Sequence, residues 1–195
     1  MKRRLLLGLA LGLAVAALYA ARRPLQEAGF PLDPYVTALV AIPVVLLALR
    51  KISLADMGLA GVGRVGYGLF FVALLPGILY LRLRLMGIPF ALAPFAFSLI
   101  IGSLAEEFFF RGYLQKDFEK SSNATTSFIL TNALFTLVHV VKGYSALPSL
   151  VIFAIGLYFS FARHEKGGGS LVYPMAAHVL YNIVASSMPQ AGSWF

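Results

Sequence analysis

Long apolar stretches, separated by short polar loops, extend along almost the whole of this 195-residue chain. Hydrophobic residues make up 59% of it and charged residues only 12%, whereas a soluble domain carries about 25% charged residues. An apolar stretch of about 20 residues crosses the hydrocarbon core of a bilayer as a helix, and a helix satisfies its own backbone hydrogen bonds in lipid. The apolar runs are continuous rather than alternating, which favours helices over a transmembrane barrel. We therefore predict an all-α, polytopic transmembrane helical bundle.

The apolar stretches predict seven membrane spans. They lie near Leu5–Ala21, Tyr35–Leu49, Val65–Leu81, Phe90–Gln115, Ala124–Val141, Leu147–Ala162 and Leu171–Met188. The first span follows the basic residues MKRR and also resembles a secretory signal peptide, whose cleavage would leave six spans. A cut after Ala20 would place Leu18 where a small residue is required, so we predict that the first helix is retained.

The basic residues predict the orientation of the spans, because cytoplasmic loops carry an excess of Lys and Arg. With the N-terminus in the cytoplasm, the inner side holds ten of them: Lys2, Arg3, Arg4, Arg50, Lys51, Arg64, Lys116, Lys120, Arg163 and Lys166. The outer side then holds five: Arg22, Arg23, Arg82, Arg84 and Lys142. We therefore predict a cytoplasmic N-terminus.

The composition also excludes several classes of function. The net charge of +8 comes from basic residues that flank the spans, and no basic stripe with interleaved aromatic residues points to nucleic acid as a partner. The chain has no cysteine, which excludes disulfides, thiolate metal sites and a cysteine nucleophile. It shows no internal repeat and no second domain.

Six polar residues lie within the apolar spans, on three different helices. They are Glu106, Glu107 and Arg111 of the fourth span, His139 of the fifth, and His178 and Asn182 of the seventh. An ionisable residue inside a membrane costs several kcal/mol or more and therefore tends to face the bundle interior or a water-filled cavity. We predict that the six residues share one polar intramembrane cavity.

The spacing of these residues supports a shared cavity. Glu107 and Arg111 are four residues apart, so they lie on one helix face and can form an ion pair. His178 and Asn182 have the same spacing and project together. Glu106 and Glu107 are about 100° apart around the helix, so they are expected to have different roles, with Glu106 facing the cavity.

Two kinds of chemistry fit this set of residues. A carboxylate and a histidine that reach the same water can deprotonate it for attack on a carbonyl, while a second histidine and an asparagine can donate hydrogen bonds to the developing oxyanion. Alternatively, one Glu and two His are the ligands of a catalytic zinc ion, although the HExxH spacing is absent. The Glu107–Arg111 pair alone is also explained as a structural ion pair, and a single intramembrane His or Asn as a packing residue.

The motifs resemble those of the CAAX protease and bacteriocin-processing family, the Rce1-like intramembrane glutamate proteases. EEFFFR at 106–111 fits EExxxR, FTLVH at 135–139 fits FxxxH, and HVLYN at 178–182 fits HxxxN. The resemblance covers about residues 90–188 as a catalytic core; residues 1–89 correspond to a variable N-terminal part, and 189–195 form a short tail.

This resemblance implies a role for each of the six residues. Glu106 activates water together with His139, His178 and Asn182 form an oxyanion hole, and Glu107 and Arg111 support the site. The resemblance also implies a conical cavity open to lipid and to the cytoplasmic side, and a mechanism that needs no cofactor or metal.

The leading hypothesis is therefore an intramembrane endopeptidase. It would cut a peptide bond near the membrane surface in a lipidated or membrane-anchored protein, in a prokaryotic plasma membrane. One rival is a non-catalytic binding or immunity protein with the same fold. The other is a transporter or proton relay, which would favour inverted repeats or broken helices, and neither feature is evident.

Overall fold

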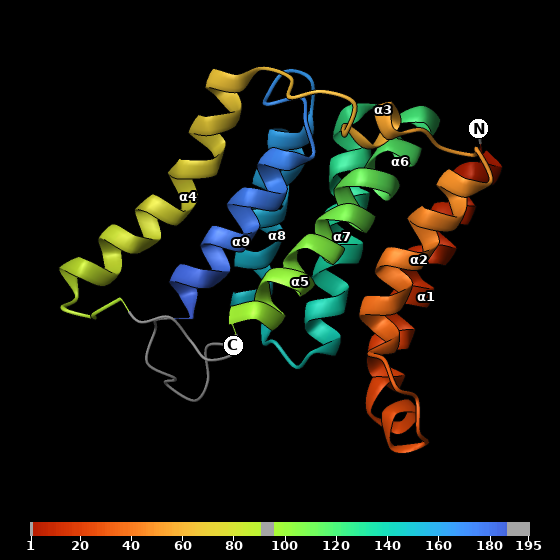
Figure 1. The fold of residues 1–195 in the computed structure, drawn as a ribbon, viewed down its shortest axis with the longest axis horizontal. Helices are drawn as coiled ribbons and strands as arrows, with labels where there is room; N and C mark the ends of the chain where they lie inside the picture. Colours follow the sequence, from red (N-terminus) through yellow and green to blue (C-terminus); the bar gives the residue numbers. More distant parts are fainter. Residues whose placement is uncertain (1, 91–95, 187–195) are drawn as a thin grey trace.

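The computed structural model describes residues 2–90 and 96–186, and these residues form a helical bundle (Figure 1). The elements in chain order are α1 (Lys2–Glu27), α2 (Pro34–Ala48), α3 (Leu54–Met57), α4 (Val65–Leu85), α5 (Ala96–Glu107), η1 (Phe108–Leu114), α6 (Gln115–Ser121), α7 (Ala124–Val141), α8 (Ala146–Arg163) and α9 (Val172–Ala185). The predicted helical membrane bundle is confirmed.

Each predicted span corresponds to a helix in the described part of the chain. Helices α1, α4, α7 and α8 are long and apolar enough to cross a membrane, whereas α2 and α9 are apolar but shorter. The fourth span continues as α5, η1 and α6 as far as Ser121, beyond its predicted end at Gln115. The predicted end of the seventh span at Met188 and the predicted tail 189–195 lie outside the described residues.

Side-chain caps fix the first residues of helices α2 and α7. Asp33 precedes α2, and its carboxylate accepts hydrogen bonds from the backbone N–H groups of Tyr35 and Val36, at 2.9 and 3.2 Å. Asn123 precedes α7, and its side chain accepts from the N–H of Thr126 at 2.9 Å. Such caps satisfy backbone donors that the helix leaves unpaired, so the chain enters both helices at a defined residue.

Small residues allow α1 to approach the rest of the bundle closely. A Cβ atom on Gly8 would lie 2.6 Å from the ring of Phe118, and one on Gly12 would lie 2.5 Å from Leu134. Val15, one turn further along α1, is fully buried. Close backbone approach through glycine is a common way for membrane helices to pack, and it makes α1 part of the core that surrounds α5, η1 and α7.

The two ends of the bundle differ in what they carry. The N-terminus, α3 and α6 lie at one end, which we call the α3 end, at the top of Figure 1. The connections from α1 to α2 and from α7 to α8 lie at the opposite end, which we call the Lys142 end because Lys142 follows α7 there.

Candidate active site

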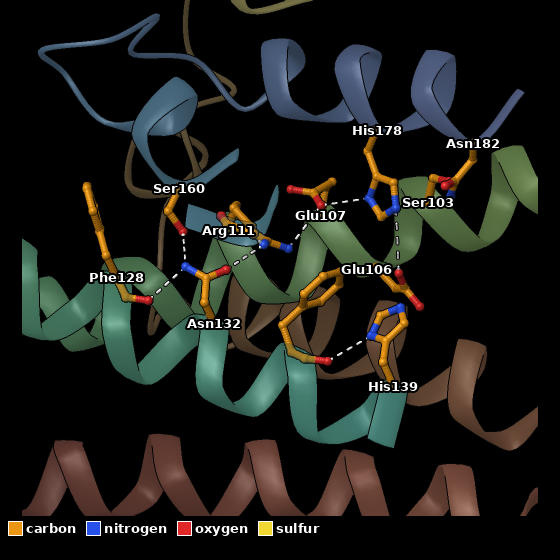
Figure 2. A network of polar contacts seen from close by, with 12 residues as sticks. Ser103, Glu106, Glu107, Arg111, Phe128, Asn132, His139, Ser160, His178 and Asn182 are labelled. Carbon is orange, nitrogen blue, oxygen red and sulfur yellow. Dashed lines mark hydrogen bonds and ion pairs between the residues drawn. The ribbon is translucent and has the colours of Figure 1, made fainter. Parts of the chain in front are cut away.

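The fold brings all six predicted site residues into one polar cluster (Figure 2). They come from the end of α5, from η1, from the last turn of α7 and from the middle and end of α9: Glu106, Glu107, Arg111, His139, His178 and Asn182. Glu107 and Arg111 have no exposed surface, and Glu106 and His178 are 6% and 5% exposed. His139 and Asn182 are only half-buried, so the cluster is more accessible on their side.

The two adjacent glutamates have different partners, as their positions around the helix predict. Glu106 Oε1 accepts a hydrogen bond from the Tyr35 hydroxyl and an ion-paired one from Lys142 Nζ, both at 2.9 Å. Glu107 Oε1 accepts from Arg111 Nη1 at 3.0 Å, which confirms the predicted ion pair. Each carboxylate therefore has its own cation, and the two negative charges are neutralised separately.

His178 lies between the two glutamates. Its Nδ1 atom is 2.8 Å from Glu107 Oε1, and its Nε2 atom is 3.9 Å from Glu106 Oε2. A carboxylate paired with arginine can only accept a hydrogen bond, so Nδ1 carries the proton of this contact. The ring stacks on Phe159, with centroids 5.0 Å apart and planes 26° apart. The imidazole is thus fixed in orientation, with Nε2 directed to the Glu106 side.

His139 reaches the same space from α7. Its Nδ1 atom is 2.9 Å from the carbonyl oxygen of Phe135. A carbonyl only accepts, so Nδ1 is protonated and, in the neutral ring, Nε2 is left as a base. The ring also packs 4.7 Å from that of Phe135. Figure 2 shows His139 and Glu106 next to each other although they belong to different helices.

Asn182 stands one turn beyond His178 on α9. Its Nδ2 atom donates to Ser103 Oγ at 2.8 Å, and Ser103 Oγ in turn donates to the Leu99 carbonyl at 2.7 Å. An asparagine amide has two N–H donors, so this contact orients the side chain while the second donor is still available to a ligand.

Arg111 anchors the deep side of the cluster. Its Nη2 atom donates to Asn132 Oδ1 at 2.8 Å and to the carbonyl oxygen of Gly156 at 3.2 Å. Asn132 Nδ2 donates to Ser160 Oγ at 2.9 Å. The guanidinium carbon lies 4.3 Å from the centre of the Phe135 ring. These contacts tie η1 to α7 and α8, and they hold the cation that neutralises the second glutamate.

The helix that carries these residues changes its hydrogen-bonding pattern directly after Glu107. Residues Phe108–Leu114 are π-helical, so their backbone hydrogen bonds span five residues instead of four. Arg111 lies within this wider segment and still reaches Glu107. The α-helical spacing assumed from the sequence therefore predicts the Glu107–Arg111 contact correctly. It does not predict that the backbone between the two residues becomes π-helical.

The structure adds four residues to the predicted cluster: Tyr35, Ser103, Asn132 and Lys142. Lys142 is three residues after His139, so helical spacing could have placed both on one face of α7. From its position between two predicted spans, Lys142 is predicted only to be a loop charge. No local pattern links Tyr35 or Asn132 to the site, because their partners are 71 and 21 residues away.

Along the bundle axis, the Glu106 side of the cluster lies towards the Lys142 end. His139 is two residues from the end of α7, and Asn182 is three residues from the end of α9. Tyr35 is the second residue of α2, which starts at the same end. Within residues 2–90 and 96–186, no three His, Cys, Asp or Glu side chains are grouped as metal ligands would be.

Comparison with known proteins assigns the chain to a family. No curated protein and no solved structure gives a significant match. A family model for the Rce1-like type II CAAX prenyl endopeptidases matches residues 87–184, which is half of the chain and includes all six predicted site residues. This match and the four long apolar helices identify an integral membrane protein of a protease family. The chain therefore belongs to the Rce1-like type II CAAX prenyl endopeptidase family.

Proposed function

We propose that this protein is a glutamate-type intramembrane endopeptidase that hydrolyses a peptide bond near the membrane surface in a lipidated or membrane-anchored protein. The observation that carries the proposal is the convergence of Glu106, His139 and His178 from three helices on one partly accessible, polar space inside an apolar bundle. Buried ionisable groups on separate helices are costly in a membrane, and a shared catalytic task explains why all of them are present.

In this proposal Glu106 and His139 activate the attacking water. A water between the Glu106 carboxylate and His139 Nε2 gives up a proton as its oxygen attacks the substrate carbonyl carbon. The C–N bond of the resulting tetrahedral intermediate then breaks, and the same proton passes to the leaving amine. The Nδ1–H contact of His139 with the Phe135 carbonyl supports this role, because it leaves Nε2 free to act as the base.

His178 and Asn182 are proposed to stabilise the oxyanion of that intermediate. Because His178 Nδ1–H is engaged with Glu107, a second N–H can come only from a protonated Nε2. The role therefore requires a proton on both ring nitrogens of His178. Asn182 contributes the amide hydrogen that does not bind Ser103.

Glu107 and Arg111 are positioning residues in this scheme. Glu107 holds the His178 ring at 2.8 Å, and Arg111 keeps the Glu107 carboxylate in place at 3.0 Å. Neither needs to touch the substrate. Replacing either one is expected to lower the turnover number more than it raises the Michaelis constant.

The mechanism as proposed uses no metal ion. Measuring cleavage in the presence of metal chelators tests this. The alternative is a zinc ion held by Glu106 and the two histidines, whose removal would abolish cleavage. Under the proposed mechanism, cleavage survives EDTA and phenanthroline unchanged.

The test is cleavage of a library of membrane-anchored peptides by the protein in proteoliposomes. Glu106→Gln and His139→Ala are expected to abolish cleavage, while Glu165→Gln and His164→Ala are matched controls outside the site that retain it. Normal cleavage by Glu106→Gln would refute the role of Glu106 in activating the water, and normal cleavage by His139→Ala would refute that of His139 as the base. Folded wild-type protein that cuts no member of the library would favour the rival role of a non-catalytic binding or immunity protein.

A further inference from the structure

The two oxygens of the Glu106 carboxylate have different surroundings. Oε1 accepts hydrogen bonds from the Tyr35 hydroxyl and from Lys142 Nζ, both at 2.9 Å. Oε2 is 3.9 Å from His178 Nε2, which is too far for a direct hydrogen bond. Figure 2 shows the Glu106 side chain between the rings of His178 and His139. The carboxylate is therefore held through Oε1, while Oε2 lies on the side of a histidine that the proposed mechanism uses.

Tyr35 is fixed by contacts of its backbone and of its ring. Its N–H donates to the Asp33 carboxylate at 2.9 Å, which places the residue at the start of α2. Its ring packs edge-on against that of Tyr19 of α1, with centroids 5.0 Å apart and planes at 87°. Only 3% of Tyr35 is exposed. Because the packed ring cannot turn away, the hydroxyl is a hydrogen-bond donor at a fixed position.

The other donor to Oε1 is less constrained. The Lys142 ammonium lies at the end of a flexible four-carbon chain, and this side chain, directly after α7, is 19% exposed. Lys142 supplies the charge that neutralises Glu106, but its ammonium can follow the carboxylate when the carboxylate rotates. The Tyr35 hydroxyl cannot follow it. The orientation of the Glu106 carboxylate therefore depends on Tyr35 more than on Lys142.

We propose that Tyr35 is a positioning residue for the cleavage reaction: its hydroxyl holds Oε1 of Glu106 and thereby presents Oε2 to the attacking water. The inference rests on the proposed role of Glu106 and adds to it which oxygen takes part. A carboxylate that rotates freely presents its oxygens at varying distances, and a misplacement of about 1 Å can lower a rate about a hundredfold.

This role extends the catalytic unit beyond the part of the chain that the family model matches. Tyr35 belongs to α2, whereas the match covers residues 87–184. Helix α2 is packed against both α5 and η1, which carry the two glutamates and Arg111. A helix from the N-terminal half therefore sets the geometry of a carboxylate in the C-terminal half.

Tyr35→Phe tests the role, because it removes one oxygen atom and keeps the ring that packs on Tyr19. In proteoliposomes, with a peptide that the wild type cleaves, the turnover number should fall about 10- to 100-fold. The Michaelis constant should stay within about twofold, because the lost contact is not with the substrate. Tyr19→Phe is the matched control, which removes the same atom from the neighbouring ring and should keep both wild-type values.

Two kinetic results would overturn the inference while leaving the protease assignment intact. A normal turnover number in Tyr35→Phe would show that the hydroxyl does not position Glu106. A raised Michaelis constant with a normal turnover number would show that Tyr35 binds the substrate instead. Equal losses in Tyr35→Phe and Tyr19→Phe would assign the effect to packing between α1 and α2, and would overturn it as well.

Infrared spectroscopy tests the contact without relying on cleavage. A hydrogen bond to a carboxylate changes the frequency of its antisymmetric stretch, so Tyr35→Phe should shift a band that Glu106→Gln removes. An unchanged band would overturn the inference. A shifted band in a protein whose wild type cuts no peptide would instead refute the proposed function, and the role of Tyr35 in cleavage with it, while confirming that Tyr35 binds Glu106.

Discussion

Replacing Gly156 by alanine tests whether the buried arginine network supports the active site. Gly156 lies on α8, where its carbonyl oxygen accepts a hydrogen bond from Arg111. An added Cβ would lie 2.2 Å from Asn132 Oδ1 and 3.0 Å from Arg111 Nη2. The Asn132 oxygen would have to retreat by about 1 Å to reach an ordinary contact distance. Its 2.8 Å hydrogen bond with Arg111 would then break.

The size of the effect follows from two opposing changes, the broken hydrogen bond and the higher helix propensity of alanine. A hydrogen bond to a charged group contributes about 1.5–3 kcal/mol, and both partners here are fully buried. Alanine in a helix interior is favoured over glycine by about 1 kcal/mol. We therefore expect Gly156→Ala to lower the free energy of unfolding by about 0.5–2 kcal/mol. If Arg111 shifts with Asn132, the orientation of Glu107 and His178 is also lost, and a barrier higher by about 1.4 kcal/mol lowers the turnover number about tenfold.

The measurement is thermal unfolding in detergent, followed by the helical circular dichroism signal, together with peptide cleavage in proteoliposomes. Gly77→Ala on α4 is the matched control, because a Cβ there meets no atom within 4 Å. It should be as stable as the wild type or slightly more so, and fully active. If Gly156→Ala behaved like Gly77→Ala in both assays, the contact between Arg111 and Asn132 would not be supporting the site.

Three further changes have definite expected outcomes. Lys142→Met leaves the buried Glu106 carboxylate without its cation and should lower the free energy of unfolding by about 2 kcal/mol. Thermal unfolding measures this loss, and Lys142→Arg should recover most of the stability. The hydrogen bond from Lys120 lowers the pKa of Asp56 below its ordinary value of 3.8. The resulting stabilisation is complete above about pH 4 and is lost as the pH falls through the lowered pKa. Thermal unfolding of Asp56→Asn should therefore vary less between about pH 2 and pH 6 than that of the wild type; an equal variation would contradict the role of the pair. Gly68→Ala would place a Cβ 2.1 Å from the ring of Tyr173, so its unfolding temperature should fall, and an unchanged value would show that α4 and α9 can separate freely there.

The sequence was sufficient to predict the helices and the residues that meet, because both depend on local patterns. Apolar length alone placed all seven spans on helices. The four-residue spacing of Glu107 and Arg111 predicted a contact that the structure has at 3.0 Å. A charged residue within an apolar span is also expected to contact another polar group, because burying it alone in an apolar bundle is costly. The convergence of Glu106, His139 and His178 follows from that requirement.

What the sequence did not predict depends on contacts between distant segments. Tyr35 belongs to a span assigned only to the variable part of the chain, yet its hydroxyl donates to Glu106. Asn132 lies 21 residues from Arg111 in the sequence, yet its side-chain oxygen accepts a hydrogen bond from that guanidinium. Lys142 was counted as a loop charge, although it pairs with a buried carboxylate. Each of these contacts depends on which helices pack against one another, and the spacing of residues within one helix does not show that.

The π-helical segment after Glu107 makes this stretch unusually tolerant of a change in length. Hydrogen bonds that span five residues accommodate one more residue in the turn than a regular helix does. Deleting a single residue from Phe108–Leu114 would let the backbone relax into an ordinary α-helix. Because the wider turn already absorbs the extra residue, this deletion would leave Gln115 and Phe118 in their buried positions, whereas a deletion within regular α-helix rotates everything that follows by about 100°. Related chains are therefore expected to lose one residue within Phe108–Leu114 more readily than within the regular helices on either side.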